Sequence, residues 1–398
     1  MKSYIILTGS IYDMGGAEMF TSNKCAYLKS KGWEVRVFYF NKGNRILIDN
    51  LTEFEKNYIP ELKYGYYYFT ESQRKRIFNH VCNGLTRNDE IVIESHLIGL
   101  SYWAELISEH IGAKSILNCM EEKIRQVSPS EAAFLEYKVF RHEVLNGTPR
   151  AFQRYFGELY KTEYDCYENK MVPLCSNVVS ESANEKVNIP EADFNLLSIG
   201  RLDKPYVQTM LQGVKNFVER YNQYQFNFLI IGGSPDGSVE KQIQGMFENI
   251  PNVKVRLLGY LFPVPAAFIR KADVGMASAN SILVTADQGI PTISYDMSDY
   301  QTMGIYRYTT NNKFKRQDEP AIPTEILLEE ILIGRKYIRT SPVEIDSNQL
   351  EKVFSSQVDF LSKSPNDHGA YDVMSIHSWS EKCIANLKRV VLTILRKW

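Results

Sequence analysis

The chain has 398 residues, of which 44% are hydrophobic and 23% are charged, and its formal net charge is −1. A chain of this length exceeds a single hydrophobic core, so we expect two domains. The near-zero charge argues against a protein that binds nucleic acid through its phosphates. No stretch is long and apolar enough for a transmembrane span. The six cysteines form no CxxC pair, which argues against zinc and a disulfide framework and favours a reducing cytoplasm.

The first half of the chain alternates apolar runs with amphipathic stretches. Residues 4–8 are nearly all apolar, which predicts a central parallel strand. An amphipathic stretch that Gly32 closes and a second strand over 34–40 would complete a right-handed βαβ unit. Further strands are expected over 62–69, 90–94, 114–119 and 175–180, and helices over 72–83, 100–110 and 128–167.

Two glycines and a histidine are the candidate site residues of this half. Gly15 and Gly16 precede a helix, where backbone N–H groups can approach a phosphate or a sugar hydroxyl. The alternative for this pair is a simple strand-to-helix turn. His96 comes just after the apolar run 90–94, where ligands bind in α/β sheets. The alternative for His96 is a histidine of the core or of a helix cap.

A polar stretch that contains a proline, residues 182–191, predicts the boundary between two domains. We therefore expect an N-terminal domain over 1–185, a second domain over 186–375 and a final helix over 376–398 that returns to the first domain. In the second domain, strands are expected over 194–199, 226–231, 253–258, 273–277 and 292–296, and helices over 207–221, 238–249, 266–271, 282–288, 321–339 and 350–361.

The strongest site signal is the sequence SIGRLDK at the end of the strand 194–199. Gly200 ends the apolar run, and Arg201 and Lys204 follow at once. Arginine offers a planar fork of donors and lysine a point charge, so the two could clamp a diphosphate. The alternative is a local ion pair at the strand end, with Asp203 as the partner.

Three further loops of this half fall at strand ends. Gly233 follows the strand 226–231 and allows close approach of a ligand, although a plain turn is the alternative. Tyr260 follows the strand 253–258 and would contact a base or ribose, or pack on the core. Asn280 or Ser281 would cap the next helix, and its first N–H groups would face a phosphate.

The two successive α/β halves resemble the two-Rossmann architecture of GT-B glycosyltransferases. SIGRLDK resembles the donor-diphosphate loop of the bacterial retaining glycosyltransferases of family four, also called glycosyltransferase group 1. The residues 15–18 resemble that family's N-terminal glycine loop. The segment ADVGMASANSILVTADQGIPTIS resembles its nucleotide-sugar segment, and HSWSEKCIANL its final helix, which crosses back to the N-terminal domain.

The resemblance implies a GT-B fold, with two doubly wound Rossmann-like domains that face each other across a cleft. It also implies a metal-independent, retaining hexosyltransferase with a UDP- or GDP-linked donor and a saccharide or lipid-linked saccharide acceptor. Such enzymes serve capsule, exopolysaccharide or lipopolysaccharide synthesis in the cytoplasm or at the inner face of the membrane. Arg201, Lys204 and His96 would be the catalytic residues. The donor would be bound by Gly15, Gly16, Gly200, Gly233, Tyr260, Ser281, Ile282 and Thr285.

One departure from the family's pattern leaves a second function open. The family carries two glutamates with seven residues between them in the nucleotide-sugar segment, whereas here no glutamate lies between Ala272 and Asp296. Ser281, Thr285 and Asp287 would take over their role, or the chain would be an inactive partner subunit of an active transferase. Another GT-B enzyme, a sugar-nucleotide 2-epimerase, is a third interpretation. Such enzymes pair acidic residues with histidine, and here the residues available are Glu94, His96 and Glu121.

Overall fold

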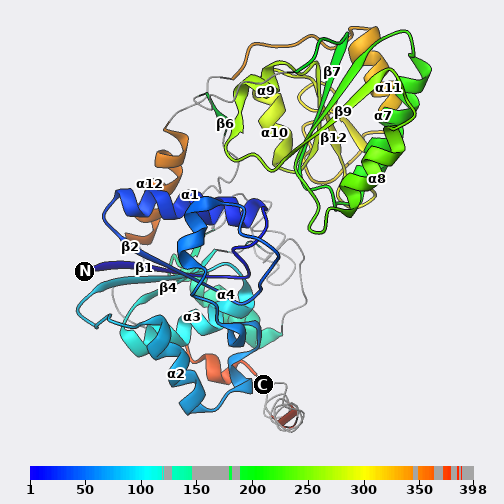
Figure 1. Cartoon of the computed structure of the whole chain (residues 1–398). Coiled ribbons are helices and arrows are strands. Elements are labelled where there is room, and N and C mark those ends of the chain that lie inside the picture. Colours follow the sequence, from blue (N-terminus) through cyan, green and yellow to red (C-terminus); the bar gives the residue numbers. More distant parts are fainter. Residues whose placement is uncertain are drawn as a thin grey trace. The chain divides into compact units, whose positions relative to one another are not determined.

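The computed structural model describes residues 1–118, 120, 128–145, 179–181, 189–343, 348–362 and 371–377, and residues 383, 384 and 387. Contacts divide the chain into two compact units (Figure 1). Unit 1 comprises residues 1–13, 17–176 and 347–398, and unit 2 comprises residues 14–16 and 177–346.

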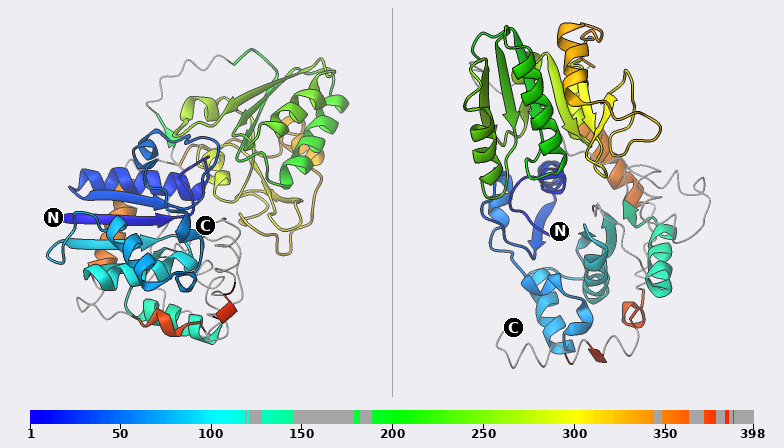
Figure 2. Two further views of the ribbon diagram at one scale, coloured as in Figure 1. Left: turned by 60° about the horizontal axis from the view of Figure 1, so that its bottom comes forward. Right: turned by 90° about the vertical axis from the view of Figure 1, so that its right-hand side faces the viewer.

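Unit 1 is built on a parallel sheet of five strands in the order β2-β1-β3-β4-β5. Strand β1 lies inside the sheet, between β2 and β3, and its residues Tyr4, Ile5, Ile6 and Leu7 are each at most 1% exposed. Such a strand needs cover on both faces. Helices α1 and α12 cover one face and α2 and α3 the other (Figures 1 and 2). The strands are β1 (Lys2–Thr8), β2 (Glu34–Tyr39), β3 (Glu90–Ser95), β4 (Lys114–Asn118) and β5 (Val144–Leu145), and the helices α1 (Gly16–Ser30), α2 (Glu71–Val81), α3 (Ile98–Ile111), α4 (Pro129–Phe140) and α12 (Gln349–Ser362).

Local sequence signals set the ends of three of these helices. Thr70 and Gln73 form a capping box at the start of α2, and Ser128 and Glu131 form another at the start of α4. Helix α3 ends at Gly112, which adopts the left-handed conformation with φ of 79°.

The prediction of a strand over 62–69 is wrong. This segment forms the short 3-10 turns η2 (Pro60–Lys63) and η3 (Tyr66–Tyr68), because Pro60 and Gly65 interrupt an extended ladder. Its tyrosines pack instead on the C-terminal segment. The Tyr66 hydroxyl donates to the Val373 carbonyl, and the rings of Tyr67 and His377 lie 4.2 Å apart.

Unit 2 is built on a sheet of six strands in the order β13-β12-β11-β7-β8-β9, in which only the edge strand β13 is antiparallel. Helices α7, α8 and α11 cover one face, and α9 and α10 the other (Figure 1). The strands are β7 (Phe194–Ile199), β8 (Phe226–Ile231), β9 (Val253–Gly259), β11 (Val274–Ser278), β12 (Thr292–Tyr295) and β13 (Thr302–Ile305), and β6 (Val179–Ser180) pairs separately with β10 (Val264–Pro265). The helices are α7 (Tyr206–Arg220), α8 (Ser238–Phe247), α9 (Ala266–Arg270), α10 (Ser281–Ala286) and α11 (Thr324–Leu328).

Most predicted strands are confirmed, and the long predicted helices are the least accurate. β7 and β8 begin and end at the predicted residues. The helix predicted over 128–167 ends at Phe140, and residues 146–167 lie outside the described part of the chain. The helix predicted over 321–339 is only α11 and a π-helical turn, Glu329–Ile333. Most of the final helix predicted over 376–398 lies outside the described residues.

Both units are thus mostly parallel sheets between layers of helices, as the sequence predicts. Among the described residues, no helix is long and apolar enough to cross a membrane.

Candidate functional site

The strongest candidate site lies in unit 2, at the edge where the parallel strands β7, β8, β9, β11 and β12 end, which we call the carboxyl edge. Two glycines bring the ends of β7 and β8 into close contact. Gly200 has a φ of 147° and Gly232 a φ of 137°, and a Cβ on Gly232 would lie 1.9 Å from the Gly200 oxygen. Their N–H groups donate to the Ile231 and Gly259 carbonyls, at 3.0 and 2.7 Å. Both glycines therefore allow close approach of backbone, and their N–H groups are used within the sheet.

The predicted residues Gly233 and Tyr260 lie together at this edge. The Tyr260 hydroxyl donates to the Gly233 carbonyl at 2.7 Å. Glu240 completes the group, since its carboxylate accepts from the Ser234 N–H at 2.7 Å and from the Ser234 hydroxyl. Glu240 is not among the site residues predicted from the sequence. Its position in the first turn of the helix after the glycine loop was the available signal.

Arg201 and Lys204 lie on the loop after β7, and the arginine has a local partner. Its Nε and Nη2 atoms donate to the two carboxylate oxygens of Asp203 at 2.9 and 2.5 Å. These hydrogen bonds lower the pKa of the Asp203 carboxyl. The Arg201 side chain is still 43% exposed, and Lys204 is half-buried. The ion pair that the sequence allowed is therefore present, on a guanidinium that solvent and ligands can reach.

The predicted residues of α10 divide into one surface residue and two core residues. Ser281 is half-buried at the start of the helix. Ile282 and Thr285 are each 0% exposed, and the Thr285 hydroxyl donates to the Ile282 carbonyl at 3.2 Å. The expected side-chain cap is not formed, because Asn280, the N-cap residue, has helical backbone angles and makes no capping hydrogen bond. Asp287 is paired with Arg307 at 2.6 Å.

The predicted glycines, which the contacts assign to unit 2, lie where the sequence placed them, after β1 and at the start of α1. Helix α1 begins at Gly16, which is exposed, and Gly15 is half-buried before it. Asp13 precedes them with a φ of 63°, and its N–H donates to the Arg45 carbonyl at 2.9 Å. This geometry fits a turn into a helix as well as a phosphate loop.

Glu94, at the end of β3, is the centre of a fully buried polar cluster that also contains His96. One carboxylate oxygen accepts from the Tyr4 hydroxyl at 2.5 Å and from the Lys24 ammonium group. The other accepts from the Asn118 amide at 2.9 Å and lies 3.1 Å from the His96 Nε2 atom. Burial by itself raises the pKa of Glu94, but Lys24 and His96 outweigh it and hold that pKa below its ordinary value.

His96 is thus a histidine of the core. Its side chain is 1% exposed, and its Nδ1 atom lies 3.1 Å from the Thr8 hydroxyl. The sequence predicted its place beyond a strand end correctly and left its burial open. Glu121, the third residue considered with Glu94 and His96, lies outside the described residues.

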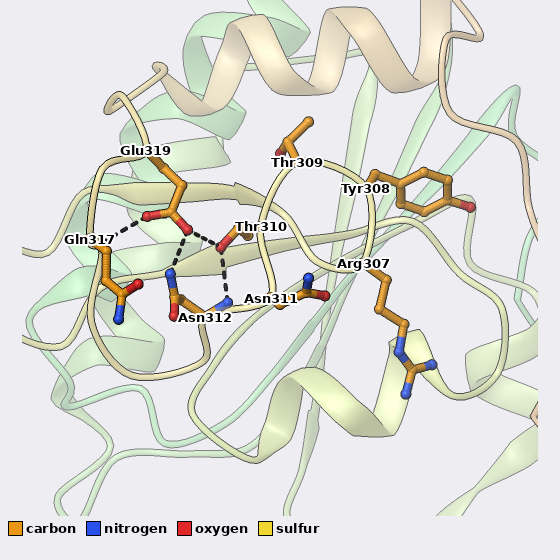
Figure 3. Close-up of a pocket in the computed structure, with 8 residues that line it drawn as sticks. All are labelled: Arg307, Tyr308, Thr309, Thr310, Asn311, Asn312, Gln317 and Glu319. Atoms are coloured by element: carbon orange, nitrogen blue, oxygen red, sulfur yellow. Dashed lines mark hydrogen bonds between the residues drawn. The ribbon is translucent and has the colours of Figure 1, made fainter. Parts of the chain in front are cut away.

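A hollow on the surface of unit 2 contains none of the predicted site residues (Figure 3). It has a volume of about 390 Å³ and is lined by Arg307, Tyr308, Thr309, Thr310, Asn311, Asn312, Gln317 and Glu319. Glu319 accepts from Thr310 at 2.6 Å and from the Gln317 N–H at 2.8 Å, and these bonds lower its pKa to about 2. Within the described ranges, no group of three or more His, Cys, Asp or Glu residues could hold a metal ion.

No protein-family model and no curated protein matches this sequence. Solved structures do match its fold. A glycosyltransferase from Rickettsia africae matches with a TM-score of 0.54 at 12% identity, over 100% of both chains. The S. aureus MnaA–UDP complex matches with a TM-score of 0.51 at 13% identity, over 92% of this chain and 100% of that chain. UDP-N-acetylglucosamine 2-epimerase from Rickettsia bellii matches with a TM-score of 0.51 at 12% identity, over 94% and 99%. At these identities the likeness shows the fold alone: the chain has the GT-B fold with two Rossmann-like domains, as its sequence predicts.

Proposed function

We propose that the protein is a glycosyltransferase that moves a hexose from a UDP- or GDP-linked sugar to a saccharide or lipid-linked saccharide. The observation that carries this proposal is the carboxyl edge of unit 2. There, Arg201 and Lys204 follow Gly200, whose backbone packs closely against Gly232 at the ends of β7 and β8. Ligands of open α/β sheets bind at this edge.

In this proposal the two cations stabilise the charge that develops on the leaving diphosphate. Breaking the glycosidic bond leaves a negative charge on the phosphate oxygen, and fixed donors aimed at that oxygen lower the barrier. Arg201 would bind two phosphate oxygens through its fork, and Lys204 would add a point charge. No metal is required when two cations do this work. Retention of anomeric configuration is proposed from the resemblance of SIGRLDK to the retaining family.

A nucleotide screen followed by two substitutions tests the proposal. UDP, GDP and their hexose conjugates are screened by thermal shift, and the best donor is used to measure hydrolysis and transfer. Arg201→Ala and Lys204→Ala should each lower the rate about 100-fold or more, as expected for the loss of one such donor. Lys254→Ala is the control, because Lys254 is exposed near the start of β9, at the opposite edge of the sheet. Unchanged hydrolysis and transfer in both variants would contradict the role assigned to these cations.

We also propose that the enzyme works in the cytoplasm, with peripheral contact to the membrane that holds a lipid-linked acceptor, in the synthesis of a surface polysaccharide. The basic and apolar end of the sequence, residues 388–398, supports this proposal. Flotation with anionic vesicles tests it, and a protein that stays in the unbound fraction at low salt would contradict it. The proposed retention of anomeric configuration is tested separately, by proton NMR of the transfer product.

An inactive partner subunit is the second candidate function. The absence of glutamate between residues 272 and 296 favours it, as does the burial of Thr285, which would otherwise replace a lost polar contact. A protein that binds no nucleotide or nucleotide sugar, and that raises the activity or stability of a transferase on mixing, would establish this function.

A sugar-nucleotide 2-epimerase is the third. The Glu94–His96 pair favours it, and the R. bellii structure of similar fold is named as such an enzyme. The 1% exposure of His96 argues against direct contact with a substrate. NMR of UDP-N-acetylglucosamine incubated with the protein alone distinguishes epimerisation from glycosyl transfer. An epimerase changes the sugar without an acceptor, whereas a transferase needs an acceptor.

A further inference from the structure

The segment 313–316 lies at the carboxyl edge of unit 2, beside the residues that follow β11 and β12. Three hydrogen bonds fix it to the ends of β11 and β12. The Ala279 N–H donates to the Lys313 carbonyl at 2.9 Å, and the Met297 N–H to the Phe314 carbonyl at 3.1 Å. The Arg316 N–H donates to Asp296 at 2.6 Å. Lys313 is therefore held at the carboxyl edge, although it lies far from SIGRLDK in the sequence.

The sheet topology places Lys313 beside the end of β7. Strands β11 and β7 are neighbours, with Met276 opposite Ser198. Continued for two residues past that pair, the same register would set Ser278, the last residue of β11, opposite Gly200. The backbone of Lys313 is bonded to the residue that follows β11. Lys313 and Arg201 thus stand on the loops of adjacent strands.

The ammonium group of Lys313 lies 5.9 Å from the centre of the Phe314 ring and has weak partners within the described residues. Its ammonium group donates to the Asn280 amide oxygen at 3.5 Å, and it forms no salt bridge to any carboxylate of the described residues. Two arginines nearby differ, since Arg307 is paired with Asp287 and Arg316 with Asp299. Partial burial lowers the pKa of Lys313, and Asp287 only partly opposes this. A desolvated ammonium group in such a place gains most from an anionic ligand.

We propose that Lys313 binds an anionic group of the nucleotide-sugar donor, as a third cation of the site that contains Arg201 and Lys204. This inference rests on the proposed function. Two sources of the anion fit the chemistry, namely a phosphate of the nucleotide and the carboxylate of a uronic acid donor. With either anion, a hydrogen bond from the Lys313 ammonium group to the anion replaces its weak contact with Asn280.

Isothermal titration of UDP, GDP, UDP-glucose and UDP-glucuronate into the full chain tests the inference. Lys313→Ala should weaken binding about tenfold, the effect of one charge-assisted hydrogen bond. Lys313→Arg should retain most of the affinity. Lys315→Ala is the matched control, because Lys315 is exposed two residues away in the same segment. Circular dichroism and the thermal midpoint of Lys313→Ala show whether its fold is intact, and the arginine variant tests the charge if it is not.

The pattern across ligands identifies the anion. If Lys313→Ala weakens binding of every nucleoside diphosphate ligand that the wild-type protein binds, Lys313 contacts a phosphate. If it weakens binding of UDP-glucuronate alone, Lys313 contacts the sugar carboxylate. Unchanged affinity of Lys313→Ala for every ligand that the wild-type protein binds would overturn the inference and leave the proposed function standing. A wild-type protein that binds none of these ligands would overturn the proposed function itself, and the inference with it.

Discussion

At the scale of single residues, the partner of Arg201 decides how its site works. The guanidinium group directs two donors at Asp203, whereas a diphosphate would need the same planar fork. Asp203 is partly exposed, so the ion pair is weak and can be exchanged. We therefore interpret Asp203 as a residue that holds Arg201 in place until an anion displaces it.

This interpretation predicts that Asp203→Asn binds nucleoside diphosphate more tightly than the wild-type protein. An exposed ion pair is worth up to about 1 kcal/mol, so the gain should be about fivefold. Titration of UDP and GDP measures it. Asp318→Asn, at an exposed carboxylate outside the strand-end loops, should change affinity little. Weaker binding in Asp203→Asn would mean that the aspartate positions Arg201 for the ligand.

The cluster around Glu94 gives a second prediction at this scale. Glu94→Gln removes the countercharge of Lys24, which is buried, and should lower the free energy of unfolding by about 3 kcal/mol or more. Glu90→Gln, on the exposed start of the same strand, should cost far less. Urea denaturation of both variants measures the difference. Equal losses would show that the buried pair has no special role.

The pH dependence of this difference follows from the direction of the pKa shift. The pKa of Glu94 is lower in the folded protein than its unfolded value of about 4.3. The ionised carboxylate therefore contributes stability above that value, and the contribution is lost as the pH falls. The gap between wild-type protein and Glu94→Gln should thus narrow below about pH 4, which denaturation at several pH values measures.

At the scale of elements, the end of β8 shows why a glycine is needed at one position. Any side chain on Gly232 would collide with the Gly200 backbone, and its φ of 137° is unfavourable for other residues. The glycine thus fixes the spacing of the two strand ends, and with it the shape of the edge that would receive a ligand.

Gly232→Ala should accordingly destabilise unit 2 by more than about 2 kcal/mol and abolish nucleotide binding. Gly245→Ala is the matched control, because Gly245 lies inside helix α8 with no atom within 4 Å of an added Cβ. That variant should be more stable by about 0.5–1 kcal/mol. Thermal unfolding with and without UDP and GDP measures both effects, and a Gly232→Ala protein with normal binding would contradict the argument.

The segment 60–69 shows a tertiary effect on an element. Its tyrosines have the composition of a strand, yet Tyr66 is fully buried and bonded to Val373. The partner lies more than 300 residues away in the sequence, so no local pattern could have revealed it. Pro60 and Gly65 were the only local signals against a strand.

At the scale of the whole molecule, each unit has its own hydrophobic core, and the strongest candidate site belongs to unit 2. We expect a nucleoside diphosphate to slow amide hydrogen exchange in unit 2, first in the loops after β7, β8 and β11. At 100 times its dissociation constant the ligand should add about 2.7 kcal/mol of stability. Uridine and guanosine, which lack the diphosphate, are the controls. Protection confined to unit 1 would contradict the placement of the donor site.

The sequence by itself determined the α/β class, the positions of most strands along the chain and the glycine loops at the ends of those strands. Hydrophobic periodicity and glycine act over a few neighbouring residues, so these features can be predicted locally. Only the tertiary structure decided that His96 and Thr285 are buried and that Lys313 joins the carboxyl edge. These outcomes depend on packing between segments far apart in the chain, where burial and the nearest opposite charge fix what a polar side chain can do.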